Sequence, residues 1–191
     1  AVWRDKVDTY VDAMLKEMEF TSRLMKDKKL DTFYMGGGTP TTLEAEQLDR
    51  VLGFFEEHFD TAALKEYTIE AGRPDSITRD KLMVMKKHGV NRISINPQTM
   101  NDDTLKLIGR HHTVAQVREA FLLARECGFD NINMDLIIGL PGETQEHIER
   151  TMAEIAKLSP DSLTVHSLAI KRAANLNIFR EKYKDYAMVN T

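Results

Sequence analysis

The sequence alternates regularly between short strand-like segments and longer amphipathic ones. Strands are expected at residues 31–35, 65–71, 92–96, 131–138 and 162–170. Apolar residues recur at helical spacing in the first segment, at Val7, Tyr10, Val11, Met14, Leu15 and Met18. A second helix is expected to start at a T-x-x-E capping box formed by Thr41 and Glu44. Further helices are expected over residues 78–88, 113–127 and 145–158. Parallel strands need long, usually helical connections. The alternation therefore predicts an α/β fold with five parallel strands.

The middle strands carry one polar row and one apolar row. Glu66, Thr68 and Glu70 alternate with Tyr67 and Ile69, and the same period of two gives the polar rows Arg92, Ser94, Asn96 and Asn131, Asn133, Asp135. Successive side chains of a strand point to opposite faces, and sheets covered by helices on both faces are apolar nearly throughout. The pattern predicts a partial, open parallel barrel with a polar, ligand-bearing inner face. We expect Glu70, Ser94, Gln98 and Asp135 to face one cleft.

Three consecutive glycines, Gly36, Gly37 and Gly38, follow the first expected strand and precede Thr39 and Pro40. Without a Cβ atom, the backbone there can approach a ligand closely. An ordinary strand-to-helix turn is the alternative, but such turns rarely need three glycines in a row. The segment lacks the G-x-x-x-x-G-K-[ST] pattern of a P-loop. The sequence therefore favours a ligand-binding turn of another kind.

Further polar residues fall at, near or beyond the carboxyl ends of later strands. Glu70 ends the second strand, Gln98 follows the third, Asp135 interrupts an apolar run in the fourth, and Arg110 lies in a loop beyond the third. Taken singly, each also fits a structural role as a solvated carboxylate, a salt-bridge partner or a surface arginine. Ligands bind at the carboxyl-end face of α/β barrels, and arginine suits a carboxylate. Together they indicate a site for an amino acid joined to a nucleoside.

Few other residues are candidates for chemistry. Cys127 is the only cysteine, so the chain has no internal disulfide or cysteine-only metal site, and a free thiol fits a reducing cytoplasm. Adjacent His111 and His112 lack an evident third ligand, and His166 is expected to line the sheet or the core. No catalytic residue and no metal ligand is assigned.

Composition excludes two classes of partner. The net charge is −4 over 191 residues, which provides no basic field for nucleic acid. No apolar run approaches the roughly 20 residues of a membrane span. We therefore expect neither nucleic-acid binding nor a membrane span.

Five segments together resemble the motifs of the radical S-adenosylmethionine (SAM) superfamily. They are GGGTPT at 36–41, IEAGRPD at 69–75, SINPQTM at 94–100, LIGRHH at 107–112 and NMDLIIGLPGET at 133–144. The resemblance extends over about residues 5–172. It implies a SAM site in which Gly36, Gly37, Gly38 and Thr39 meet the amino group, Gln98 and Asp135 the ribose, and Arg110 the carboxylate, with Glu70 and Ser94 completing the set.

Within the superfamily, the chain is similar to the oxygen-independent coproporphyrinogen III oxidase branch, through EAGRPD at 70–75 and HSLAIKR at 166–172. Members of this branch convert two propionates of coproporphyrinogen III to vinyl groups. The resemblance implies SAM and a [4Fe-4S] cluster as cofactors, with a 5′-deoxyadenosyl radical that takes a hydrogen from the propionate β-carbon. It also implies a porphyrinogen substrate, an unidentified electron donor or acceptor, and a cytoplasmic location.

The chain departs from the family pattern at several points. The C-x-x-x-C-x-x-C loop that holds the cluster is expected upstream of Ala1, with a first strand, so we expect this chain alone to be cluster-free and inactive. Residues 1–172 would form an incomplete core, and residues 173–191 would begin a carboxyl-terminal extension. Asn96-Pro97 replaces the more usual Gly-Val before Gln98, which leaves the backbone path there open.

Three other functions compete with the oxidase. A haem chaperone of the same branch would differ in a haem-binding segment beyond Thr191. A sugar-phosphate or aldolase-type barrel enzyme would need a Schiff-base lysine, and no lysine lies on the polar rows of the inner strands. The chain could also be a scaffold without activity of its own.

Overall fold

The computed structural model describes residues 2–168. Its helices are α1 (Val2–Leu24), α2 (Ala45–His58), α3 (Arg79–Lys87), α4 (Asp102–Leu107), α5 (Val114–Glu126) and α6 (Gln145–Leu158). Its strands are β1 (Thr32–Met35), β2 (Glu66–Gly72), β3 (Arg92–Gln98), β4 (Ile132–Ile138) and β5 (Ser162–Ser167), and two short 3-10 turns are η1 (Pro40–Thr42) and η2 (Pro74–Ser76). The expected end of the last strand at residue 170 and the expected boundary at residue 172 lie outside the described residues.

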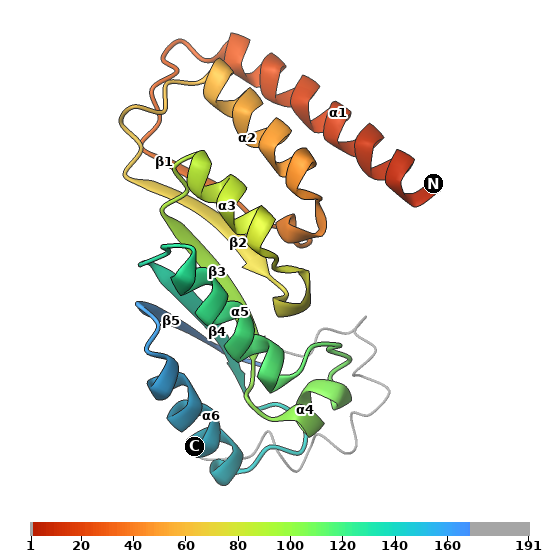
Figure 1. Ribbon diagram of the computed structural model, residues 1–191, viewed down its shortest axis with the longest axis vertical. Coiled ribbons are helices and arrows are strands. Elements are labelled where there is room, and N and C mark those ends of the chain that lie inside the picture. Colours follow the sequence, from red (N-terminus) through yellow and green to blue (C-terminus); the bar gives the residue numbers. More distant parts are fainter. Residues whose placement is uncertain (1, 169–191) are drawn as a thin grey trace.

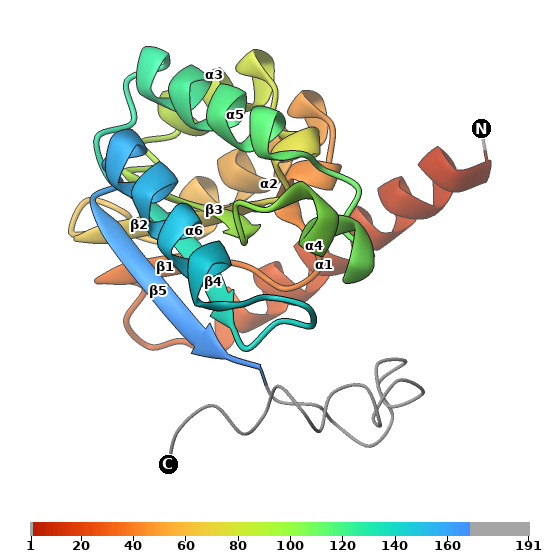
Figure 2. The same cartoon turned by 90° about the horizontal axis from the view of Figure 1, so that it is seen from below.

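The five strands form one sheet in the order β1-β2-β3-β4-β5, and every pair is parallel. Each strand therefore pairs with the strand that follows it in the chain. Figures 1 and 2 show a curved, open sheet with α2, α3, α5 and α6 along one face, and α1 packed beside α2. The predicted α/β fold, an open parallel half-barrel, is confirmed.

The apolar rows of the strands face these helices. Ile69 of β2, Ile95 of β3 and Met134 of β4 are completely buried. They belong to one core cluster with Phe121 of α5. Burial of each such side chain contributes about 1.5–3 kcal/mol, so the apolar row fixes which face of the sheet the helices cover. The polar row is left on the opposite, concave side.

One local expectation is wrong. Thr41 does not start a helix: it lies in η1, and α2 begins at Ala45 with a capping box formed by Glu44 and Gln47. Thr41 is fully buried, and its hydroxyl is used for contacts to a later part of the chain. The loop that carries Arg110 is found as expected, but an additional helix precedes it. This helix, α4, has only six residues, which is too short to show clear periodicity.

None of the helices in residues 2–168 is long and apolar enough to cross a membrane.

Candidate functional site

A continuous row of hydrogen-bonded polar groups crosses the concave face of the sheet. The Gly37 N–H donates to Glu70 Oε2 at 3.3 Å, and Asn96 Nδ2 donates to Glu70 Oε1 at 3.1 Å. Ser94 Oγ donates to Asn96 Oδ1 at 2.9 Å, which extends the row along β3. The row thus connects the glycine turn after β1 with the middle of the sheet, and it places Glu70 and Ser94 on the same face, as the sequence predicts.

Asn133 of β4 joins this row to the last two strands. Its Nδ2 donates to Ser94 Oγ at 3.1 Å and to Asp135 Oδ1 at 2.6 Å. Its Oδ1 accepts from Ser162 Oγ at 2.9 Å and from Thr164 Oγ1 at 3.2 Å. The amide is buried, with 4% of the residue exposed, and it uses both donors and both lone pairs of its oxygen. Asp135 therefore lies on the concave face and away from the helix layer.

The glycine turn is open on one side and tightly packed on the other. A Cβ at Gly36 would collide with the Tyr34 ring and lie 2.9 Å from Glu70 Oε2. Gly37 has φ +108, a value that side-chain-bearing residues rarely adopt, and no atom lies within 4 Å of a Cβ built at Gly37 or Gly38. Gly36 is thus required by packing and Gly37 by backbone conformation, while the space in front of Gly37 and Gly38 is free to admit a ligand.

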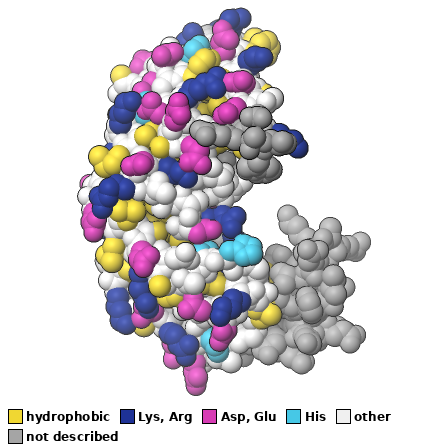
Figure 3. Space-filling model, turned by 45° about the vertical axis from the view of Figure 1, so that its right-hand side comes forward, with side chains coloured by type: hydrophobic (Ala, Val, Ile, Leu, Met, Phe, Trp, Pro, Cys, Tyr) yellow, Lys and Arg dark blue, Asp and Glu magenta, His cyan; other side chains and the backbone are white. Residues whose placement is uncertain are grey.

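A groove of about 390 Å³ lies against this turn. It is lined by Met35, Gly36, Gly38 and Thr39 on one side and by Tyr10 and Met14 of α1 among others. Figure 3 shows the hollowed side of the molecule, with basic, acidic and histidine side chains near the hollow. The glycine turn is therefore accessible from the side of α1, and the hollowed side of the molecule carries charged groups of both signs.

Tyr34 of β1 also belongs to the site, although the sequence analysis did not single it out. Its phenol pKa is raised by partial burial and then by the charges of Glu70 and Asp135. The geometry agrees, because the Tyr34 ring lies against the glycine turn, where a Cβ at Gly36 would collide with it. Its position before Gly36, with the period-two pattern of β1, was the available signal.

Gln98 occupies the end of β3 in an unusual backbone conformation. Its φ is +69, one of two positive values among the described non-glycine residues. The ladder between β3 and β4 is irregular between Ile95 and Gln98, at the point where Asn96-Pro97 departs from the family pattern. Gln98 is 7% exposed, and its side chain forms no hydrogen bond to residues 2–168. The structure therefore does not join Gln98 to the polar row that holds Glu70, Ser94 and Asp135.

Arg110 is half-buried in the loop that follows α4. Its backbone N–H bonds to Leu105 O at 2.8 Å, but its guanidinium forms no hydrogen bond or ion pair within the described part of the chain. Burial lowers its pKa, and the positive charge of Arg73 lowers it further. Arg73 has one weak ion pair, from Nε to Asp75 Oδ1 at 3.6 Å. Arg73 thus has one weak carboxylate contact, and the nearby Arg110 guanidinium has none among the described residues, an arrangement that suits an incoming anion.

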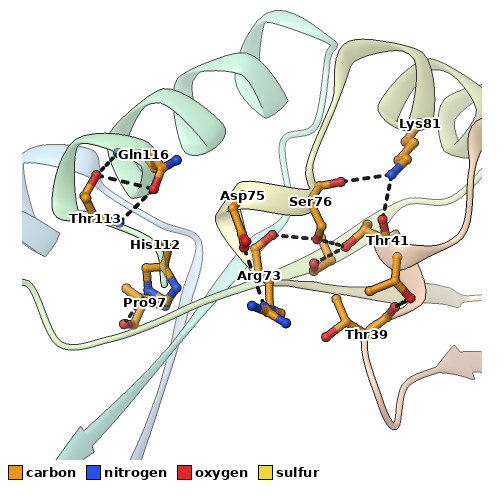
Figure 4. A network of polar contacts seen from close by, with 12 residues as sticks. Thr39, Thr41, Arg73, Asp75, Ser76, Lys81, Pro97, His112, Thr113 and Gln116 are labelled. Atoms are coloured by element: carbon orange, nitrogen blue, oxygen red, sulfur yellow. Dashed lines mark hydrogen bonds and ion pairs between the residues drawn. The ribbon is translucent and has the colours of Figure 1, made fainter. Parts of the chain in front are cut away.

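His112 contacts the backbone near the carboxyl end of β3. Its Nε2 lies 3.2 Å from the Pro97 carbonyl oxygen (Figure 4), and its Nδ1 is buried without a partner in the described residues. Burial lowers the pKa of the ring, so it is neutral near pH 7 and donates from Nε2. His111 is exposed. Among residues 2–168, no three His, Cys, Asp or Glu side chains gather where they could hold a metal ion.

The sequence-predicted residues thus form two groups. The glycine turn, Glu70, Ser94 and Asp135 belong to the hydrogen-bonded row, whereas Arg110 and Gln98 lie apart from it near His112 and Arg73. The sequence pattern identifies Asn96 and Asn133 only as members of polar rows, yet their side chains make the hydrogen bonds that join Glu70, Ser94 and Asp135. A period of two reveals which face a side chain occupies but not which neighbour it bonds.

Comparison with known proteins gives a consistent result. The sequence profile of the radical SAM superfamily matches residues 8–155. The chain is 46% identical over 182 residues to the oxygen-independent coproporphyrinogen-III oxidase-like protein HemZ of Bacillus subtilis, covering 94% of this chain and 36% of that protein. It is 39% identical over 166 residues to the haem chaperone HemW of the same organism, covering 86% and 44%.

The fold also matches a solved structure. Coproporphyrinogen III oxidase (HemN) from Escherichia coli, described as a radical SAM enzyme, superimposes with a TM-score of 0.81 at 33% identity, covering 94% of this chain and 40% of that one. The chain therefore spans less than half the length of each of these relatives.

Proposed function

The chain belongs to the radical SAM superfamily, and from this membership we propose that the concave face of its sheet binds SAM. The observation that supports this most strongly is the polar row, because it holds two carboxylates, Glu70 and Asp135, in fixed orientation at the open side of the sheet. Carboxylates accept hydrogen bonds from hydroxyl and ammonium groups. Arg110, whose guanidinium has no acceptor in the described part of the chain, would pair with the carboxylate of the ligand.

The residues present fit SAM in chemistry. Its amino group needs acceptors, which the turn at Gly36, Gly37 and Gly38 offers as backbone oxygens, and its ribose needs acceptors such as Asp135. Gln98 and Ser94 are proposed to complete the site. When bound, SAM supplies the oxidising power for hydrogen-atom abstraction, and the residues of this chain bind and orient it.

The same residues do not fit a [4Fe-4S] cluster. Such clusters are held mainly by cysteine thiolates, and the single Cys127 is buried at the end of α5, with its Sγ 3.8 Å from Arg79 Nη1. We assign no residue of this chain to a cluster and expect its ligands elsewhere in the full-length protein. We also propose residues 1–172 as the incomplete core and residues 173–191 as the start of a further extension.

For the full-length protein, we propose oxygen-independent oxidative decarboxylation of coproporphyrinogen III. Each reacting propionate would lose its carboxylate as CO₂, together with one hydrogen atom from the β-carbon and one electron, and become a vinyl group. Support comes from the similarity to proteins named as oxidase or oxidase-like. The electron acceptor lies outside this chain.

A haem chaperone is the second candidate. It is favoured by the 39% identity to HemW of Bacillus subtilis, which exceeds the 34% identity to the Escherichia coli oxidase. The two functions separate in one experiment on the full-length protein. An oxidase yields vinyl products from coproporphyrinogen III under anaerobic conditions with SAM and a reductant. A chaperone yields none and binds haem stoichiometrically.

SAM binding is tested separately by calorimetric titration of the full-length protein. Arg110→Met should weaken binding about tenfold or more, since hydrogen bonds to charged groups are the strong ones. Asp130→Ala is the matched control, because Asp130 is exposed and lies at the amino end of β4, opposite the site. If the unaltered protein fails to bind SAM, or Arg110→Met binds it normally, the proposed site is wrong.

A further inference from the structure

Lys81 of α3 is a buried lysine whose ammonium group bonds to backbone carbonyl groups. Only 8% of the residue is exposed. Its Nζ donates to the Thr41 carbonyl oxygen at 2.8 Å and to the Ser76 carbonyl oxygen at 3.3 Å (Figure 4). No acidic side chain of residues 2–168 pairs with it. A buried ammonium is costly unless its hydrogen bonds compensate for lost water, so these two carbonyl contacts account for its retention.

Two buried hydroxyls connect the same segments. Thr41 Oγ1 lies 2.5 Å from Ala71 O and 2.6 Å from Ser76 Oγ, and Ser76 Oγ lies 2.8 Å from Arg73 O. Two hydroxyl hydrogens serve three contacts. Two hydroxyl oxygens only 2.6 Å apart repel each other unless a hydrogen lies between them. The hydrogen bonds therefore run either from Ser76 through Thr41 to Ala71, or from Thr41 through Ser76 to Arg73. In both orders the two hydroxyls remain bonded to each other.

The segments tied together are the two turns of the proposed site. Thr41 lies in η1, which directly follows the glycine turn and Thr39. Ser76 ends η2, which directly follows Arg73 and begins four residues after Glu70. Both turns begin with proline, at Pro40 and Pro74. The Thr39 side chain also lies against the backbone of the second segment, because a Cβ at Gly72 would lie 3.3 Å from Thr39 Cγ2.

We infer that Lys81, acting with Thr41 and Ser76, is a positioning residue that sets the glycine turn and the Glu70–Arg73 turn in a fixed relation. Lys81 lies on the helix side and touches no ligand-facing atom; it acts by holding one carbonyl of each turn. The identity of the ligand rests on the function proposed above, whereas the coupling of the two turns does not.

Hydrogen exchange measured by mass spectrometry tests the coupling without any ligand. In the full-length protein, Lys81→Met should speed exchange about tenfold in both segments, 36–43 and 71–77, while β3, β4 and α5 keep their rates. Lys87→Met is the matched control: it removes an exposed lysine of the same helix that pairs with Asp49 at 2.7 Å, and neither segment should respond. Faster exchange in only one segment, or a uniform rise through the sheet, overturns the inference.

SAM affinity gives a second readout. Measured well below the melting temperature, Lys81→Met should weaken SAM binding about tenfold, and the double variant of Thr41→Val with Ser76→Ala should do the same. A residue needed only for stability would lower the melting temperature and leave the affinity unchanged, which would refute positioning. If the unaltered protein itself binds no SAM, the proposed function fails, and the exchange experiment still decides whether Lys81 couples the turns.

Discussion

The Glu70 carboxylate at the end of β2 accepts a hydrogen bond from the Gly37 backbone nitrogen, 33 residues earlier in the chain. Its other oxygen accepts from Asn96 of β3. One side chain thus fixes the glycine turn against two neighbouring strands. Because both oxygens are engaged, the carboxylate has a single orientation toward the open side of the sheet.

Replacing Glu70 by glutamine should disturb this arrangement despite the similar shape. A glutamine has one acceptor oxygen and one NH₂ group, so either the Gly37 N–H or the Asn96 amide faces a second donor. We expect SAM affinity of the full-length protein to fall about tenfold or more, measured by calorimetric titration. Glu66→Gln, at the exposed amino end of the same strand, is the control and should bind normally. Equal binding by both variants contradicts the role given to Glu70.

The isolated 191-residue chain should bind SAM weakly or not at all, whereas the full-length protein with a reconstituted cluster binds it well. Family resemblance implies that the amine and carboxylate of SAM also bind the cluster iron. Without that iron, a few hydrogen bonds of about 1 kcal/mol each must offset the entropy of fixing a flexible ligand. Titration of both proteins under anaerobic conditions measures the difference. Equal micromolar affinities would show that the cluster contributes little.

Asn133→Ala should destabilise the fold by about 2–3 kcal/mol, because it leaves buried partners such as Ser94 without their hydrogen bonds. Urea denaturation followed by circular dichroism gives the free energy of unfolding. Asn131→Ala, two residues earlier and exposed, should change it by no more than about 0.5 kcal/mol. A similar small change for Asn133 would mean that water or neighbouring groups replace its contacts.

His112 should make stability depend on pH. Its pKa in the folded chain lies below the ordinary value of 6.5 because of burial, so the unfolded chain binds the proton more readily. The free energy of unfolding should therefore be highest above pH 6.5 and decrease as the pH falls below that value. The charged groups that act on the ring are Arg110, Asp75 and Arg73.

Comparison of two neighbouring variants isolates this effect. His112→Gln should flatten the dependence of unfolding free energy on pH between about pH 7 and 5. His111→Gln should leave the dependence unchanged, because His111 is exposed. If the free energy of unfolding changes with pH in the same way for His112→Gln and the unaltered chain, groups other than His112 cause the pH dependence.

Much of the fold follows from local sequence pattern. The period of two in β2, β3 and β4 predicts which side chains face the helices, and all five strands are found close to their expected positions. The prediction that Thr41 starts a helix is wrong because its hydrogen-bond partners, Ala71 and Ser76, lie 30 or more residues away in the sequence. Capping signals describe only neighbouring residues, so they cannot reveal that a threonine is needed elsewhere.

In the site, too, local pattern predicts some features, whereas others depend on contacts between residues distant in the sequence. Glu70 and Asp135 could be placed on the polar face from alternation alone, but the bridging contacts of Asn96 and Asn133 depend on register between strands. Gln98 follows a proline and adopts a left-handed backbone conformation. This interrupts the period-two alternation of side chains along β3, so the face occupied by Gln98 could not be predicted from that alternation. Lys81 gives no sequence signal of burial, since lysines on helices are usually exposed.

The consecutive strand order has a consequence for how the chain folds. Each β-α unit docks on the unit just before it, so no strand must wait for a partner from the far end of the chain. The sequence separation between paired strands stays near one unit, which keeps the loop-closure entropy of every step similar. Folding can therefore proceed by stepwise addition along the sheet, and a unit can emerge from the ribosome and find its neighbour already in place.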